Sequence, residues 1–218
     1  MISRNHLFFE FKSMGWAAIV PLLPFIVLIS QLLTFQDDVS RLIYTLQFLI
    51  APFSCWWVIF LFQEYFEGGM DQLLPSYPLS KWEHGLIKSV LVIFIYFIIT
   101  IIVLFATSMT VSGLMFGSLL VNHLSLSLLF SSIGFLLVTS TKNVVISLSV
   151  IAIYTVTEYM TRGSVIPWYH LFTFDITASR YGTIDFESVG NVLGSIIFFS
   201  VGQFILNKKF NFIKKQPR

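Results

Sequence analysis

The amino-acid sequence predicts an all-α polytopic membrane protein with six transmembrane helices and both chain ends in the cytoplasm. Three observations support this prediction: few charges, long stretches without charged residues, and an uneven distribution of basic residues. Charged residues make up 11% of the 218 residues and hydrophobic residues 56%, whereas soluble domains carry about 25% charged residues. Because so few charges cannot cover a water-exposed surface, we expect a single transmembrane domain over residues 1–218 in the cell membrane.

Stretches without Asp, Glu, Lys or Arg mark the candidate spans, because such a residue at a helix centre costs about 2.5–3.5 kcal/mol on insertion. Five stretches are long enough to consider, and the third has 53 residues, too many for one crossing of roughly 20 residues. Turn-like residues divide it into two helices: Ser112, Gly113, Gly117 and Ser118. The predicted spans are 14–35, 42–63, 88–111, 119–140, 143–160 and 189–207.

The fifth span is short and contains Ser147, Ser149 and Thr155. Polar residues of this kind favour contact with other helices over contact with lipid.

The basic residues fix the orientation through the positive-inside rule. With a cytoplasmic N-terminus, six spans put 10 of them inside and 3 outside, the latter being Arg41, Arg162 and Arg180. Five spans would place the basic C-terminal tail on the opposite face. The N-terminal run that mixes Phe8, Phe9 and Phe11 with Arg4 and Lys12 suits a short segment in the cytoplasmic interface, although a frayed basic start remains open.

The loop at residues 63–88, between spans two and three, begins with an amphipathic pattern at helical spacing. Phe62, Phe66 and Met70 recur on one face. On the opposite face the acidic residues recur: Glu64, Glu67 and Asp71. An acidic cytoplasmic face is not attracted to anionic lipid, which favours contact with a protein. The alternative is that these residues only solvate an interfacial helix.

Further along the loop, Pro75 ends the helix, and Ser80 with Glu83 forms a capping-box pattern for the next one. A short cytoplasmic helix, a proline turn and a new helix start are therefore predicted at the membrane face.

This loop resembles the first cytoplasmic loop of the membrane subunits of ABC-2 type transporters, which reads approximately Glu-x-x-x-Gly, a Leu pair, Pro-x-Ser-Lys or Arg, and a later Lys. The matching residues are Glu64, Gly68, Leu73, Leu74, Pro78, Ser80, Lys81 and Lys88. The resemblance implies that the loop is a coupling helix seated against a separate ATPase subunit, which binds ATP and Mg, so that this chain holds no cofactor. The resemblance implies that these eight residues contact the ATPase, and the acidic helix face adds Glu67 and Asp71 as candidates.

The connection at residues 161–188 is too apolar for a free outer loop. Its aromatic residues suit the outer membrane interface: Trp168, Tyr169, Phe172 and Phe174. The resemblance to ABC-2 transporters implies an outer gate over the translocation path, while a plain interfacial anchor is the alternative.

Two polar residues within the spans are functional candidates, because ionisable groups in a membrane are costly. Glu158 either faces a pathway or pairs with Arg162 four residues on, and the spacing favours the pair. His123, beside Asn122, either lines a path or holds helices together by hydrogen bonds, and we favour the second role.

The sequence lacks the motifs of an enzyme. No glycine directly precedes a lysine, so the phosphate-binding Gly-x-x-x-x-Gly-Lys loop is absent. The four histidines form no His-Glu-x-x-His pair, and the single cysteine, Cys55, makes no metal site. The basic tail suits anionic lipid, and no nucleic-acid partner is expected.

The leading hypothesis is a permease subunit of an ATP-driven exporter, paired with a second copy or a paralogous permease. Sparse intramembrane charge favours an amphipathic cargo such as a peptide, toxin or lipid. Two alternatives stay open: a non-transporting immunity or assembly protein, and a membrane enzyme that uses Glu64, Glu67 and His84.

Overall fold

The computed structural model describes residues 10–34, 39–66, 82–111, 114–165, 170–172, 174 and 186–213. These residues form helices and no strand. Within them, six helical segments are long and apolar enough to cross a membrane: Gly15–Thr34, Val39–Phe60, Gly85–Thr110, Phe116–Thr141, Val144–Thr161 and Glu187–Lys208. The predicted number of spans is confirmed, and the chain is a multi-pass membrane protein.

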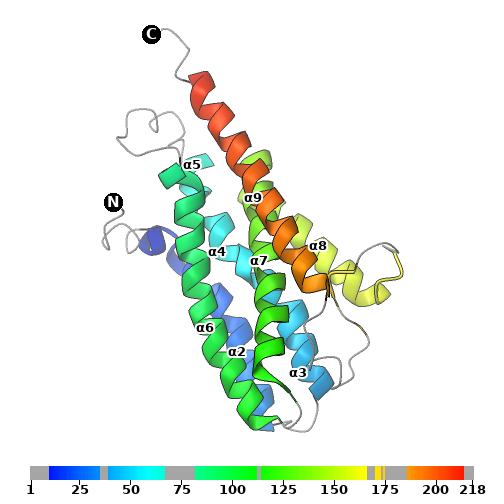
Figure 1. Cartoon of the computed structure of the whole chain (residues 1–218). Coiled ribbons are helices and arrows are strands. Elements are labelled where there is room, and N and C mark those ends of the chain that lie inside the picture. Colours follow the sequence, from blue (N-terminus) through cyan, green and yellow to red (C-terminus); the bar gives the residue numbers. More distant parts are fainter. Residues whose placement is uncertain are drawn as a thin grey trace.

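Several spans combine more than one type of helix. In chain order the elements are η1 (Gly15–Ala18), η2 (Val20–Leu22), α2 (Leu23–Thr34), α3 (Val39–Thr45), η3 (Leu46–Ile50), α4 (Ala51–Phe60), α5 (Gln63–Phe66), η6 (Glu83–Ile87), α6 (Lys88–Thr110), α7 (Phe116–Thr141), α8 (Val144–Thr161) and α9 (Phe186–Ile213). We call the end of the bundle with the α7–α8 turn the Lys142 end, and the end with the α6–α7 turn the Met115 end (Figure 1).

The first span starts with 3₁₀ turns because of its prolines. Pro21 has no amide N–H and cannot bond to the carbonyl of Ala17 four residues earlier. Two indole groups of α4 bond to the carbonyls left free. Trp56 Nε1 donates to the Ala17 carbonyl at 3.0 Å, and Trp57 Nε1 donates to the Ala18 carbonyl at 2.8 Å. These bonds stabilise the break, because the hydrocarbon core offers no other partner.

The second span contains a π-helical turn, η3, directly before the α4 segment that carries Pro52 near its start. The hydroxyl of Tyr96, on α6, donates to the carbonyl of Ile50 at 2.6 Å. Tyr96 is 1% exposed. An irregular turn inside a membrane is therefore held from a neighbouring helix, as buried backbone requires.

Helix α7 forms the centre of the bundle and makes its most extensive contacts with α9 and α4 (Figure 1). On the α4 side, Ser54 Oγ donates to the carbonyl of Ser127 at 2.7 Å, and Ser131 Oγ donates to Ser54 Oγ at 3.1 Å. On the α9 side, a Cβ at Gly202 would lie 2.7 Å from the Phe135 ring. Small residues thus allow the close helix approach that is typical of membrane bundles.

The two turns that flank α7 define its limits. The break in the 53-residue stretch lies between Thr110 and Phe116, so Gly117 falls inside the first turn of α7 rather than in the break. At the other end, Lys142 ends α7 in the left-handed conformation with φ of 59°. The Asn143 side chain then caps α8 by accepting from the amide of Ile146 at 2.9 Å. The short fifth span is a capped helix of 18 residues.

Replacing Gly202 with alanine tests the contact between α7 and α9. The added Cβ overlaps Phe135, and we expect a loss of about 1–3 kcal/mol in stability from overpacking. Thermal unfolding in detergent, followed by far-UV circular dichroism, measures this change. The same substitution at Gly117 is the matched control, because no atom lies within 4 Å of its added Cβ. Equal melting temperatures for the two variants would contradict the contact.

Candidate functional site

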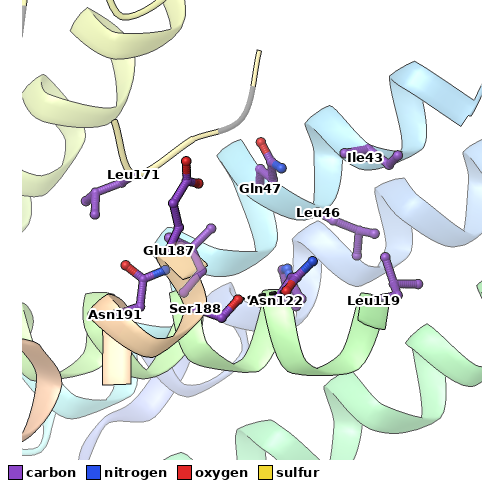
Figure 2. Close-up of a pocket in the computed structure, with 11 residues that line it drawn as sticks. Ile43, Leu46, Gln47, Leu119, Asn122, Leu171, Glu187, Ser188 and Asn191 are labelled. Carbon is purple, nitrogen blue, oxygen red and sulfur yellow. Dashed lines mark hydrogen bonds between the residues drawn. The ribbon is translucent and has the colours of Figure 1, made fainter. Parts of the chain in front are cut away.

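A cavity lined by six polar and five apolar side chains lies inside the bundle toward the Met115 end (Figure 2). Helices α3, α7 and α9 and the turn η3 surround it, with Leu171 at its edge. Its volume is about 40 Å³, which exceeds the 10–15 Å³ or so that one water molecule needs. The polar groups at the cavity, which we call the polar cavity, are Gln47, Asn122, His123, Glu187, Ser188 and Asn191.

Hydrogen bonding at the polar cavity joins α7 to α9. Ser188 Oγ donates to Asn122 Oδ1 at 2.7 Å (Figure 2). His123 is 4% exposed, and its Nε2 atom has no hydrogen-bond partner. His123 therefore lines the polar cavity, and its two predicted roles, lining a path and holding helices together, stay predictions. A buried nitrogen of this kind has free capacity to bind a water molecule or a polar ligand.

An aromatic cluster closes the space beside the polar cavity. Phe172 is 1% exposed, and its ring centroid lies 4.1 Å from that of Phe48 and 5.7 Å from that of Phe130. The Phe174 ring lies 5.7 Å from Phe48. Tyr44 on α3 holds this segment further, because its hydroxyl donates to the Phe174 carbonyl at 3.4 Å. The segment that includes Phe172 and Phe174 therefore fills the gap between η3 and α7.

Two of the four predicted gate residues, Phe172 and Phe174, thus meet in one buried cluster. The other two, Trp168 and Tyr169, lie outside the described residues.

Glu158 is buried near the end of α8, with 2% of its side chain exposed. Its Oε1 accepts from the Tyr154 hydroxyl at 3.3 Å. Its Oε2 lies 3.8 Å from His170 Nδ1, too far for a hydrogen bond, and neither atom has a hydrogen-bond partner. The predicted pair with Arg162 does not form. Arg162 ends the helix with φ of 48° and is exposed, whereas an i,i+4 pair needs helical geometry at both residues.

A second cluster, at the Lys142 end, joins the two sides of the loop between spans two and three. Lys88 is 4% exposed. Its ammonium group donates to the carboxylate of Glu10 and, at 2.9 Å, to the hydroxyl oxygen of Tyr65. Burial raises the pKa of Tyr65 despite the opposing positive charge of Lys88, so the phenol stays neutral and accepts the bond. We call Glu10, Tyr65 and Lys88 the loop clamp.

The start of α6 is also tied to the last span. The amide of Leu86 in η6 donates to Gln203 Oε1 on α9 at 3.0 Å. The residues that follow the loop therefore contact the N-terminal turn, α5 and α9 together.

The structure describes two of the ten predicted ATPase contacts, Glu64 and Lys88. Glu64 is exposed in α5, as an interaction surface requires. Lys88 points into the protein, where its ammonium group donates hydrogen bonds to Glu10 and Tyr65. The remaining candidates lie outside the described residues, and their roles stay predictions: Glu67, Gly68, Asp71, Leu73, Leu74, Pro78, Ser80 and Lys81.

Sequence reasoning missed several residues of these clusters. Glu10 lies in the N-terminal run that suits the cytoplasmic interface, and the sequence predicts no role for Tyr65 or His170. One signal was available for the loop clamp, because a lysine at the start of a predicted span needs a nearby acceptor. The acceptor itself lies 78 positions away in the sequence, and no local pattern identifies it.

Among the described residues, no group of three or more His, Cys, Asp or Glu side chains is placed to hold a metal ion. Comparisons with protein-family models, curated proteins and solved structures found no match to this chain.

The loop clamp predicts that substitutions at Lys88 and Glu10 have non-additive effects on stability. We expect Lys88→Met to lower stability by about 1.5–3 kcal/mol, because it removes the hydrogen bond between the buried ammonium and the carboxylate of Glu10. Adding Glu10→Gln should restore part of that loss. Thermal unfolding of the two single variants and the double variant in detergent measures the effect. Losses that simply add would show that the two groups do not interact.

Proposed function

We propose that this chain is the membrane subunit of an ATP-driven exporter of the ABC-2 type, paired with a second copy or a paralogous permease. A separate ATPase subunit binds ATP and Mg and seats against the loop between spans two and three. The observation that carries the proposal is the loop clamp. Lys88, after the loop, holds Tyr65, before it, and also Glu10 of the N-terminal turn.

The clamp suits the loop to transmit force. Its two ends cannot move apart without breaking bonds to a buried ammonium, which are among the stronger hydrogen bonds in proteins. A displacement of the loop by the ATPase therefore moves the ends of spans two and three together. The bond from Leu86 to Gln203 extends this movement to the last span. Lys88 takes part indirectly, as an anchor for the helix start rather than as a contact with the ATPase.

The Met115 end supports the same proposal from the opposite side. An aromatic cluster around Phe172 lies next to the polar cavity. In the proposed orientation the Lys142 end faces the cytoplasm, so this cluster closes the outer half of the path. An amphipathic cargo fits an outer half that combines apolar rings with amide and carboxylate groups.

The orientation is tested by single-cysteine labelling of the chain in intact cells. We expect Ser164→Cys, which is exposed after α8, to react with a membrane-impermeant maleimide. Glu64→Cys, exposed at the Lys142 end, should react only after the cells are opened. Cys55 is buried, so the parent chain is the unlabelled control. The reverse pattern would overturn the proposed orientation.

The coupling role is tested by co-purification with an ATPase that lacks membrane spans and is encoded next to this chain. Reversing the charge at Glu64, Glu67 and Asp71 to lysine should reduce ATPase recovery by about tenfold or more, since like charges across an interface are strongly unfavourable. Lys142→Glu is the matched control, because it changes one exposed charge at the same end of the bundle. Unchanged ATPase recovery with the triple variant would show that this loop does not bind the ATPase. It would favour the alternative, an assembly protein that needs no nucleotide.

A further inference from the structure

A groove of about 630 Å³ lies where α8 borders α2, α3 and η3. It is separate from the polar cavity, since no residue lines both. Its α8 side chains are largely exposed, with Val156 at 56% and Met160 at 73%. All of these elements belong to candidate membrane spans, so their exposed apolar surface faces lipid. The groove therefore opens to the bilayer, and we call it the lateral groove.

The side chains that line the lateral groove change in character along its length. Ser40 and Arg41 lie in the first turn of α3, at the Met115 end, and both are exposed (Figure 1). One helical turn deeper, Thr45 Oγ1 donates to Gln31 Oε1 at 2.7 Å and joins α3 to α2. Deeper still the lining becomes largely apolar, as at Leu49. The lateral groove thus has a polar end near the membrane surface and an apolar part toward the membrane centre.

The polar end of the lateral groove offers hydrogen-bond donors. The Arg41 guanidinium has five N–H donors and no acceptor, so it can bind an anion while it keeps other contacts. In Gln31 the amide oxygen accepts from Thr45, which leaves the two N–H donors of the amide for other partners. Among the described residues that line the lateral groove, none is a carboxylate. A ligand of this end must therefore present acceptors, with a negative charge near Arg41.

We propose that the lateral groove binds a bilayer glycerophospholipid. Arg41 binds the phosphate, Gln31 donates to an ester carbonyl, and an acyl chain lies along the apolar part. From the surface of a bilayer to its centre, a glycerophospholipid presents phosphate, ester carbonyl and chain. The lateral groove presents guanidinium, amide and apolar side chains in the same order.

The position of the polar end favours a lipid over a soluble phosphate ester. Arg41 lies in the first turn of the candidate span Val39–Phe60, at the depth where headgroups begin. Tyr159 lines the lateral groove near the end of α8 and is 51% exposed, as is typical of aromatic residues in the membrane interface. Since Asp37 and Asp38 precede α3 in the sequence, we expect zwitterionic lipids to bind without a preference for a net negative headgroup.

The test uses the full chain in detergent micelles and measures bound lipid by native mass spectrometry. Dioleoyl phosphatidylcholine is compared with its diether analogue, which lacks the ester carbonyls, and with dioleoylglycerol, which lacks the phosphate. Glycerophosphocholine, which lacks the chains, is the soluble probe.

We expect phosphatidylcholine to bind about tenfold more tightly than dioleoylglycerol and about fivefold more tightly than the diether. These are the factors that a hydrogen bond to a charged group and one between neutral groups supply. No ATPase is present, so the outcome is independent of the proposed transport function.

Matched variants separate the phosphate from the chain. Arg41→Gln should weaken phosphatidylcholine about tenfold and leave dioleoylglycerol unchanged. Arg162→Gln is its control, because Arg162 is exposed at the end of α8 and does not line the lateral groove. Val156→Trp places a large side chain in the lateral groove and should weaken all three lipids equally. Ile153→Trp is its control, since Ile153 is 66% exposed on the same helix and lies outside the groove lining.

Four results would overturn the proposal. Equal binding of phosphatidylcholine and dioleoylglycerol would show that the phosphate is not recognised, and equal binding of the ester and diether lipids would show the same for the carbonyl. Glycerophosphocholine that binds as tightly as phosphatidylcholine would assign the site to a soluble phosphate ester. Loss of a dimer in Val156→Trp, with lipid binding unchanged, would assign the lateral groove to a second copy of this chain. The first three results use the unaltered chain, so they decide the matter even where a variant fails to fold.

Discussion

The hydrocarbon core offers no hydrogen-bond partner to a polar group, and most of this structure follows from that constraint. Hydroxyl groups inside the spans donate to carbonyls of their own helix, as Thr100 does to Tyr96 and Thr107 to Val103, each at 2.9 Å. Where the first and second spans are irregular, side chains of other helices bond to backbone carbonyls. Trp56 donates to Ala17 at the start of the first span, and Tyr96 donates to Ile50 within the second.

The same constraint explains the central position of α7. Lipid competes with helix surfaces for apolar contact, so helix association in a membrane depends on close packing and interhelical hydrogen bonds. Helix α7 supplies both, through Ser127 and Ser131 toward α4 and through Phe135 against Gly202 of α9. Helix α8 packs less closely, with 28% of its span buried against 61% of the α7 span. That difference leaves space for the lateral groove that α8 borders.

The span pattern could be predicted from the sequence because it depends on local composition. Charge-free stretches identified all six spans, and the predicted division of the longest stretch is confirmed, with α6 ending at Thr110 and α7 beginning at Phe116. The predicted pair of Glu158 with Arg162 failed because helix spacing does not reveal where a helix ends. The partners found instead, His170 for Glu158 and Glu10 for Lys88, come from other segments of the chain. Tertiary pairs of this kind need the packed structure.

The buried polar groups at the two ends of the bundle differ in their hydrogen bonding. At the Lys142 end, the ammonium group of Lys88 donates hydrogen bonds to both Glu10 and Tyr65. Among the described residues, five buried side-chain atoms lack a hydrogen-bond partner, and they lie in the middle of the bundle or toward the Met115 end: His123 Nε2, Ser127 Oγ, Thr155 Oγ1, Glu158 Oε2 and His170 Nδ1. A satisfied buried network rigidifies the elements that it joins, whereas an unsatisfied buried group retains a desolvation penalty that a ligand can remove. The Lys142 end is therefore suited to transmit force, and the half toward the Met115 end is suited to bind what the membrane or the path presents to it.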